Sequence, residues 1–197
     1  MNDIIHFPME FTPTDFHNFW EANKDLPYSF NLIQANQILL TPKTKASISF
    51  VEELGFDFGI WNSADDAGKV ISSDHGFLLP DGKILSVDVA WVNKKVWKRI
   101  AKQTYENHEP VIPNFLIVVI PNAQNLKIHQ ENMFAWTWHG TQLAWLIELE
   151  SEKVYIYRAD GKNEELSGFD QILSADELID DLEIDLAEIK ERAAETE

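Results

Sequence analysis

The sequence predicts a single α/β domain in which a central mixed β-sheet carries helices on both faces. Residues 113–121 form a continuous apolar run with a proline at each end. This run is too short to cross a membrane and too unbroken for a half-exposed strand, so it is typical of a strand buried on both faces. Segments of helical and of strand character alternate around it, with no repeat or linker between them. We therefore expect one domain over residues 1–187 and a charged tail over 188–197.

The first half of the chain predicts helix, hairpin, helix. Thr12 and Pro13 begin a helix, with Asp15 three residues after the cap, and Pro27 ends it. Strands at 28–33 and 37–41 follow, joined by a turn at Ala35 and Asn36. A longer helix over 44–61 carries apolar residues at helical spacing.

The second half predicts a meander, two helices and further strands. The sequence Pro80-Asp81-Gly82-Lys83 is a strong hairpin signal. Gly140 is placed to end the helix before it. The expected strands are 70–72, 77–79, 84–91, 114–120, 143–149, 154–158 and a short one over 182–186. The expected helices are 93–106 and 125–138, and residues 188–197 are expected to be frayed.

Charge argues against a nucleic-acid partner. The chain has 33 acids against 16 Lys and Arg, a formal net charge of −17. Residues 176–197 hold ten acids and two bases, a net of −8, which leaves −9 for the rest. Proteins that grip a phosphate backbone normally carry a basic stripe. The densest group of basic residues is expected to form a solvent-exposed helix surface rather than a nucleic-acid site. Its members are Lys94, Lys95, Lys98, Arg99 and Lys102.

The chain has no cysteine, which excludes disulfides, thiol catalysis and thiolate zinc sites. No signal peptide and no membrane-length apolar run is present. We expect a cytoplasmic protein that does not contact a membrane.

Three segments in order resemble one known family. Residues 77–92, FLLPDGKILSVDVAWV, are similar to the family's "GF.LPDG…SPDAAWV", and residues 113–120, PNFLIVVI, to its "PDFVVEVL". Residues 130–133 and 140–147, QENM and GTQLAWLI, are similar to "EKM…NGV.LGWLI". Over about residues 12–187 the chain thus resembles the Uma-type restriction endonuclease family, a domain of unknown function in the PD-(D/E)XK nuclease superfamily. The resemblance implies a restriction-endonuclease-like fold.

The resemblance also implies a magnesium site built from acids and a lysine. Its first acid corresponds to Asp88, which is present. The early glutamate falls on Gln34, and the acid before the central strand falls on Asn114. The metal-binding glutamate falls on Val118, and the lysine falls on Asn132. One carboxylate cannot hold a hard dication that needs converging anionic oxygens.

The sequence therefore predicts a degenerate site and no cofactor, with Mg²⁺ only if nuclease activity survives. Asp88 is expected either to face solvent or to accept hydrogen bonds, with Asn114 as the obvious donor. Other candidates are weaker. His75, His108, His129 and His139 lack metal-ligand spacing and are expected to lie on the surface. Trp136 and Trp138 are expected to pack in the core.

Three functions follow from these features. The first is a non-catalytic member of the family that is retained for binding, either as a homodimer or as the protein partner of an active relative. The second is an active Mg²⁺-dependent DNA endonuclease that uses Asp88 with acids migrated from elsewhere, such as Glu52, Glu53 or Glu131. The third is an acidic protein that mimics DNA and blocks a nucleic-acid-binding partner.

Overall fold

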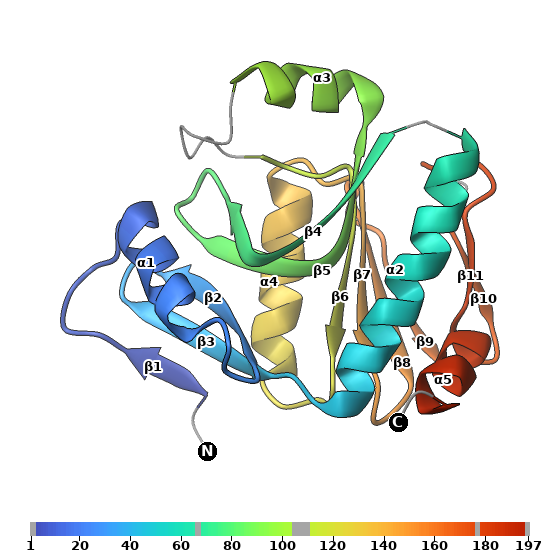
Figure 1. The fold of residues 1–197 in the computed structure, drawn as a ribbon, viewed down its shortest axis with the longest axis horizontal. Coiled ribbons are helices and arrows are strands. Elements are labelled where there is room, and N and C mark those ends of the chain that lie inside the picture. Colours follow the sequence, from blue (N-terminus) through green and yellow to red (C-terminus); the bar gives the residue numbers. More distant parts are fainter. Residues whose placement is uncertain (1–2, 66–67, 104–110, 176–177, 196–197) are drawn as a thin grey trace.

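The computed structural model describes residues 3–65, 68–103, 111–175 and 178–195 (Figure 1). Its helices are α1 (Pro13–Asn23), α2 (Lys45–Asp65), α3 (Lys94–Gln103), α4 (Leu126–Trp138) and α5 (Leu186–Glu195). Its strands are β1 (Ile4–His6), β2 (Tyr28–Gln34), β3 (Gln37–Pro42), β4 (Gly68–Leu78), β5 (Ile84–Asn93), β6 (Phe115–Ile120), β7 (Leu143–Glu148), β8 (Lys153–Arg158), β9 (Asn163–Ser167), β10 (Ile172–Ser174) and β11 (Glu183–Asp185).

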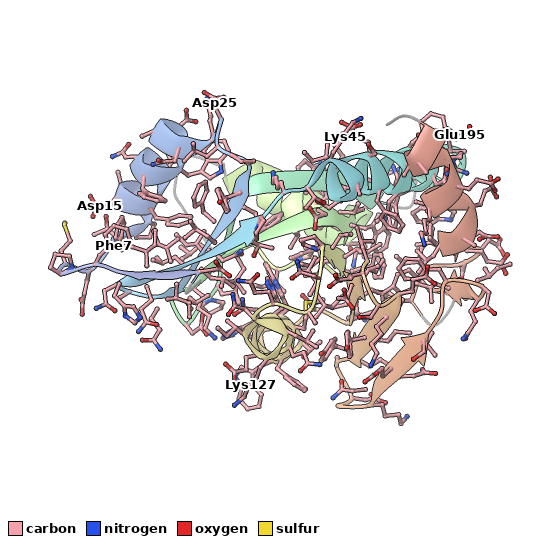
Figure 2. All side chains as sticks on the ribbon, turned by 90° about the horizontal axis from the view of Figure 1, so that it is seen from below. Phe7, Asp15, Asp25, Lys45, Lys127 and Glu195 are labelled. Carbon is pink, nitrogen blue, oxygen red and sulfur yellow. The ribbon has the colours of Figure 1, made fainter. Side chains whose placement is uncertain are left out.

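A nine-stranded mixed sheet forms the centre of the molecule. The strand order is β1-β3-β2-β5-β6-β7-β8-β9, and β4 pairs with β5. Strands β6 and β7 run parallel, whereas β5 and β6 run antiparallel. Strands β10 and β11 form a separate small sheet. Figure 2 shows α2 and α5 on one side of the main sheet and α4 on the other, so the expected mixed sheet between helices is confirmed.

Strand β6 is the buried central strand that its apolar run predicts. Phe115, Ile117 and Val119 belong to the core beneath α2 and α5. Leu116 and Ile120 belong to the core that includes α4 side chains. Because alternate residues of a strand face opposite sides, a strand between two cores must be apolar at nearly every position.

Local signals explain several element boundaries. Before α1, the Asp15 backbone N–H donates to Thr12 Oγ1 at 3.2 Å, and the Thr12 backbone N–H donates to Asp15 Oδ2 at 3.0 Å. This reciprocal pair is the predicted capping box. Gly140 follows α4 with a φ of 118°, a left-handed value that a side chain would disfavour.

The C-terminal residues form a packed helix, so the expectation of a frayed end over 188–197 is wrong for residues 188–195. Leu186, Ile189 and Ala193 recur at helical spacing and are buried. Asp185 caps the helix by accepting from the backbone N–H groups of Ala187 and Glu188, both at 3.0 Å. Although the segment is rich in acidic residues, its three buried residues form a narrow apolar stripe that is sufficient to pack the helix against the core.

The structure also bears on the strands expected over 70–79 and on the basic residues of α3. The two short strands expected over 70–72 and 77–79 are parts of one irregular strand, β4. In α3 the side chains of Lys94, Lys95 and Lys98 are exposed, while those of Arg99 and Lys102 lie outside the described part. None of the helices in the described part is both long and apolar enough to cross a membrane.

Candidate functional site

A small cavity lies where β2, β3, β5, β6 and α4 meet. Its volume is about 20 Å³, little more than one water molecule needs. We call it the Asp88 cavity. It is lined by Ser29, Asn31, Thr41, Leu85, Ser86, Asp88, Val118, Val119, Ile120, His129, Asn132, Met133 and Trp136.

Asp88 and Val118 face each other across β5 and β6. The antiparallel register pairs Val89 with Ile117, which places Asp88 opposite Val118. Asp88 Oδ2 accepts a hydrogen bond of 2.7 Å from the backbone N–H of Val119. The carboxylate is therefore oriented by main chain, and the side chain opposite it is aliphatic.

Asn31 joins β2 to β5 at the edge of the cavity. Its Oδ1 accepts from the Ser86 backbone N–H at 2.7 Å and from Ser86 Oγ at 3.1 Å. Strand alternation places Phe30 and Leu32 in the core near α1, and Asn31 on the opposite face. Ser29 shares this face and also lines the cavity, so two alternating polar side chains on a largely buried strand are the signal that could have identified Asn31 as a site residue.

Helix α4 presents one face to the cavity, with His129, Asn132, Met133 and Trp136 at helical spacing. Asn132 is only 8% exposed. Across the described ranges its side-chain amide makes no hydrogen bond. Asn132 therefore contributes a neutral amide side chain to the wall of the cavity.

His129 is buried, so the expectation that it lies on the surface is wrong. It is 5% exposed, and its Nε2 lies 3.4 Å from Thr41 Oγ1. Burial lowers the pKa of His129 from 6.5 to about 4, because an apolar environment disfavours the imidazolium. The ring is neutral at pH 7.

Of the histidines whose side chains the structure describes, only His129 lines this cavity. His139 approaches Asp81 with 3.4 Å between Nε2 and Oδ2. The side chain of His75 and the whole of His108 lie outside the described residues.

Gln34 and Asn114 do not line the cavity. Gln34 is exposed and accepts from Gln37 Nε2 at 2.6 Å. Asn114 Oδ1 accepts from the Asn93 backbone N–H at 2.9 Å, and its Nδ2 donates to Gln142 Oε1 at 2.9 Å.

The expected hydrogen bond from Asn114 to Asp88 is therefore wrong. Asn114 precedes Val118 by four residues, or about 13 Å of strand. Its amide instead joins the end of β5 to the start of β7. Of the five positions that the resemblance indicated, the structure brings Asp88, Val118 and Asn132 together.

The proposed migrated acids also lie elsewhere. Glu53 pairs with Arg192 at 2.8 Å, and Glu131 lies 4.0 Å from Lys127 on the exposed face of α4. Glu52 is exposed. None of the three lines the Asp88 cavity. No group of three or more His, Cys, Asp or Glu that could hold a metal occurs among the described residues.

These residues do not fit Mg²⁺. Among the described residues the cavity offers one carboxylate, and the other polar side chains are amides, hydroxyls and a neutral imidazole. Magnesium is typically bound by carboxylates in near-ideal octahedral geometry and gives up its waters reluctantly. The described residues at this site therefore offer hydrogen bonding around one carboxyl group.

Comparisons with known proteins agree with the fold and identify the family. A crystal structure of a putative nuclease belonging to DUF820 from Anabaena variabilis matches with a TM-score of 0.65 and 18% identity, over 93% of this chain and 99% of that one. No curated protein matches. The family profile described as "Uma2: Putative restriction endonuclease" matches residues 19–187. Most of the chain is thus covered by one family, and the chain belongs to the Uma2 family of restriction-endonuclease-like proteins.

Proposed function

We propose that this chain is a restriction-endonuclease-like protein that does not cleave DNA and is retained for binding. The observation that carries the proposal is the pairing of Asp88 with Val118 across β5 and β6. A carboxylate opposite an aliphatic side chain cannot form the two-acid clamp that a divalent ion needs. Without that ion, neither water activation nor charge stabilisation at phosphate is supplied by this cavity.

The α4 side of the cavity supports the same proposal. Asn132 is neutral, and His129 is uncharged at pH 7 because burial lowers its pKa to about 4. No lysine or arginine of the described chain lines the cavity. Negative charge developing on a phosphate would therefore meet no positive side chain there.

A protein partner suits the surface better than a nucleic acid does. A formal net charge of −17 repels a phosphate backbone. We propose that binding takes place with a second copy or with a partner protein. The alternative is that the acidic surface mimics DNA. This alternative predicts that the partner is a basic protein and that raised salt releases it.

Incubation with plasmid and single-stranded DNA in Mg²⁺ or Mn²⁺ tests the proposal. We expect no cleavage by the wild-type protein above the level of Asp88→Ala prepared in parallel. The variant controls for contaminating nuclease, because it removes the only carboxylate that the described residues place in the cavity. Cleavage that is present in wild type and absent in Asp88→Ala would show an active enzyme and overturn the proposal.

Sedimentation at several protein concentrations tests the binding partner. A dimer whose fraction rises with concentration supports self-association. A monomer throughout would exclude the second copy and leave a heterologous partner. Capture of a basic protein that is released by raised salt would favour mimicry of DNA.

A further inference from the structure

Helix α2 is apolar on both of its long sides, although only its inner side faces the core. It runs along the outside of the main sheet (Figure 1). On its outer side Ile48 is 44% exposed, Phe56 64% and Ile60 57%. The inner side contributes three buried residues to the core: Phe50, Leu54 and Phe58. A surface helix normally carries polar residues on its outer side, and one that is apolar all round is normally buried. The outer side of α2 therefore has the character of a contact surface.

The exposed apolar residues of α2 lie in one row. Ile48, Glu52, Phe56 and Ile60 follow each other at intervals of four residues, and all four are exposed. Side chains at this spacing stand next to one another along a helix and form a ridge. We call these four residues the α2 ridge. Three of its four members are apolar, so a partner that covers the ridge removes mostly apolar surface from water.

Gly55 and Gly59 form a groove beside the α2 ridge, because they occupy the neighbouring row of the helix. A side-chain carbon at either position would meet no described atom within 4 Å, and neither residue has a left-handed φ. Glycine inside a helix is destabilising, and packing within the described chain gives no reason for it here. Glycine also lets another backbone approach closely. This use fits a second helix laid across α2.

The outer side of α2 brings little charge to a contact. Two of the exposed side chains described on α2 are charged, Lys45 and Glu52, and their charges cancel. Glu53 and Asp57 of the same helix pair with Arg192 of α5. The chain as a whole carries −17, and like charges that face each other across an interface oppose binding. The outer side of α2 is thus a surface at which two copies can meet without this repulsion.

We propose that α2 packs against α2 of a second copy across a two-fold axis. The ridge and the groove lie side by side on one helix, so a two-fold axis places the ridge of each copy in the groove of the other. Interdigitation of rows spaced by four residues is the commonest helix packing in globular proteins. A different partner would need a matching ridge and groove of its own, whereas a second copy supplies both. The inference rests on the proposed function, because it names the partner of a chain that is retained for binding.

The size of this surface predicts a weak dimer. Helix α2 has 21 residues, which gives a length of about 31 Å. One side of a single helix is smaller than the surface of about 800 Å² that each partner buries in a standard interface. We therefore expect a Kd above about 1 μM, with dimers at raised protein concentration.

Sedimentation from low micromolar to submillimolar concentration tests the contact. Wild type is expected to shift from monomer to dimer. Phe56→Lys should raise Kd about tenfold or more, because it places a charge in the α2 ridge. Trp138→Lys is the matched control: it puts the same charge at an exposed aromatic position of α4, on the other side of the sheet (Figure 2). It should dimerise as wild type does. A wild-type monomer throughout, or equal weakening in both variants, would overturn the inference.

Gly55→Gln and Gly59→Gln test the groove without removing apolar surface. Each should raise Kd about tenfold or more, because a long side chain fills the groove. Each should leave the Tm of dilute, monomeric protein unchanged or raise it by about 2–4 °C, because glutamine is a better helix former than glycine. Undiminished dimerisation would overturn the inference. So would a lower Tm, since the glycines would then serve the fold of the single chain.

Single cysteines distinguish a second copy from another partner. The chain has no cysteine of its own, so one introduced cysteine reports one position. Purified Glu52→Cys, on the α2 ridge, is expected to form a covalent dimer with a short bis-maleimide, and Trp138→Cys is expected to stay monomeric. No dimer from Glu52→Cys, or equal yields from both variants, would overturn the inference. These results leave the absence of DNA cleavage untouched, whereas cleavage by wild type would overturn the proposed function and not the α2 contact.

Discussion

The Asp88 carboxylate accepts a hydrogen bond of 2.7 Å from the backbone N–H of Val119. A main-chain donor orients the carboxylate, and hydrogen bonds to an ionised acceptor are stronger than neutral ones. Asp88 is thereby aimed at the cavity whatever side chain stands at position 118. The neighbouring Val118, which also lines the cavity, stands at the position to which the resemblance assigned a metal-binding glutamate.

Restoring a second acid should create a divalent-ion site. We expect Val118→Glu to bind Mn²⁺ at least tenfold more tightly than wild type, because two carboxylates then converge across β5 and β6. Isothermal titration calorimetry measures the affinity. Gln34→Glu is the control, since it adds the same charge at an exposed position outside the cavity. Equal gains in both variants would mean that the acids act through general charge.

Burial of His129 should make the protein lose stability in mild acid. Its folded-state pKa of about 4 lies below its usual value of 6.5, so the unfolded chain takes up the proton first as pH falls. Stability is full above about pH 6.5 and decreases toward pH 4, by about 3 kcal/mol in total. His129→Gln should flatten this slope in urea unfolding between pH 4 and 7. His6→Gln, at an exposed position of β1, should keep it; equal slopes in all three proteins would contradict a buried neutral ring.

Arg192 should contribute more to the free energy of unfolding than Lys190 does. The Arg192 guanidinium pairs with Asp57 at 2.6 Å, with Glu53 at 2.8 Å and with Glu188 at 2.6 Å. These carboxylates, Asp57 first, raise the pKa of Arg192. Arg192→Ala leaves three acids facing one another between α2 and α5, and we expect it to lower the free energy of unfolding by about 1–2 kcal/mol.

Lys190→Ala is the matched control, because it removes a pair with Glu152 that is largely exposed. We expect a change within about 0.5 kcal/mol. Urea denaturation at low and high salt gives both values. Equal effects of the two variants would show that the Arg192 cluster adds nothing beyond a surface ion pair.

The two tryptophans of α4 should differ sharply in how much each contributes to stability. Trp136 is 1% exposed and contacts Phe77 edge to face with ring centroids 6.0 Å apart, whereas Trp138 is 86% exposed. Trp136→Ala should cost about 3–5 kcal/mol of stability, since it empties a core position. Trp138→Ala should change stability by less than about 0.5 kcal/mol. Chemical unfolding checks both, and a large loss for Trp138→Ala would mean that this side chain is covered in solution.

Strong local patterns predicted the framework. The proline-bounded run became β6, and the Thr12 cap became the start of α1, because both depend on neighbouring residues. The prediction that Trp138 packs in the core is wrong, since spacing alone does not say how far the sheet extends beneath a helix. The helix at the C-terminus was missed because acidic residues outnumber its three buried side chains.

By itself, the sequence determined the mixed α/β fold and the Uma2 family, and it predicted that Asp88 is the only acid among the five positions that the resemblance indicated. Only the tertiary structure decided which side chains stand around that acid. Asn31, Thr41 and His129 come from segments far apart in the chain, so no local spacing reveals that they share a cavity with Asp88. Asn114 immediately precedes β6, the strand that carries Val118, but it does not line the cavity. The physical reason is that strand register and helix rotation, which follow from the packing of two whole cores, set these distances.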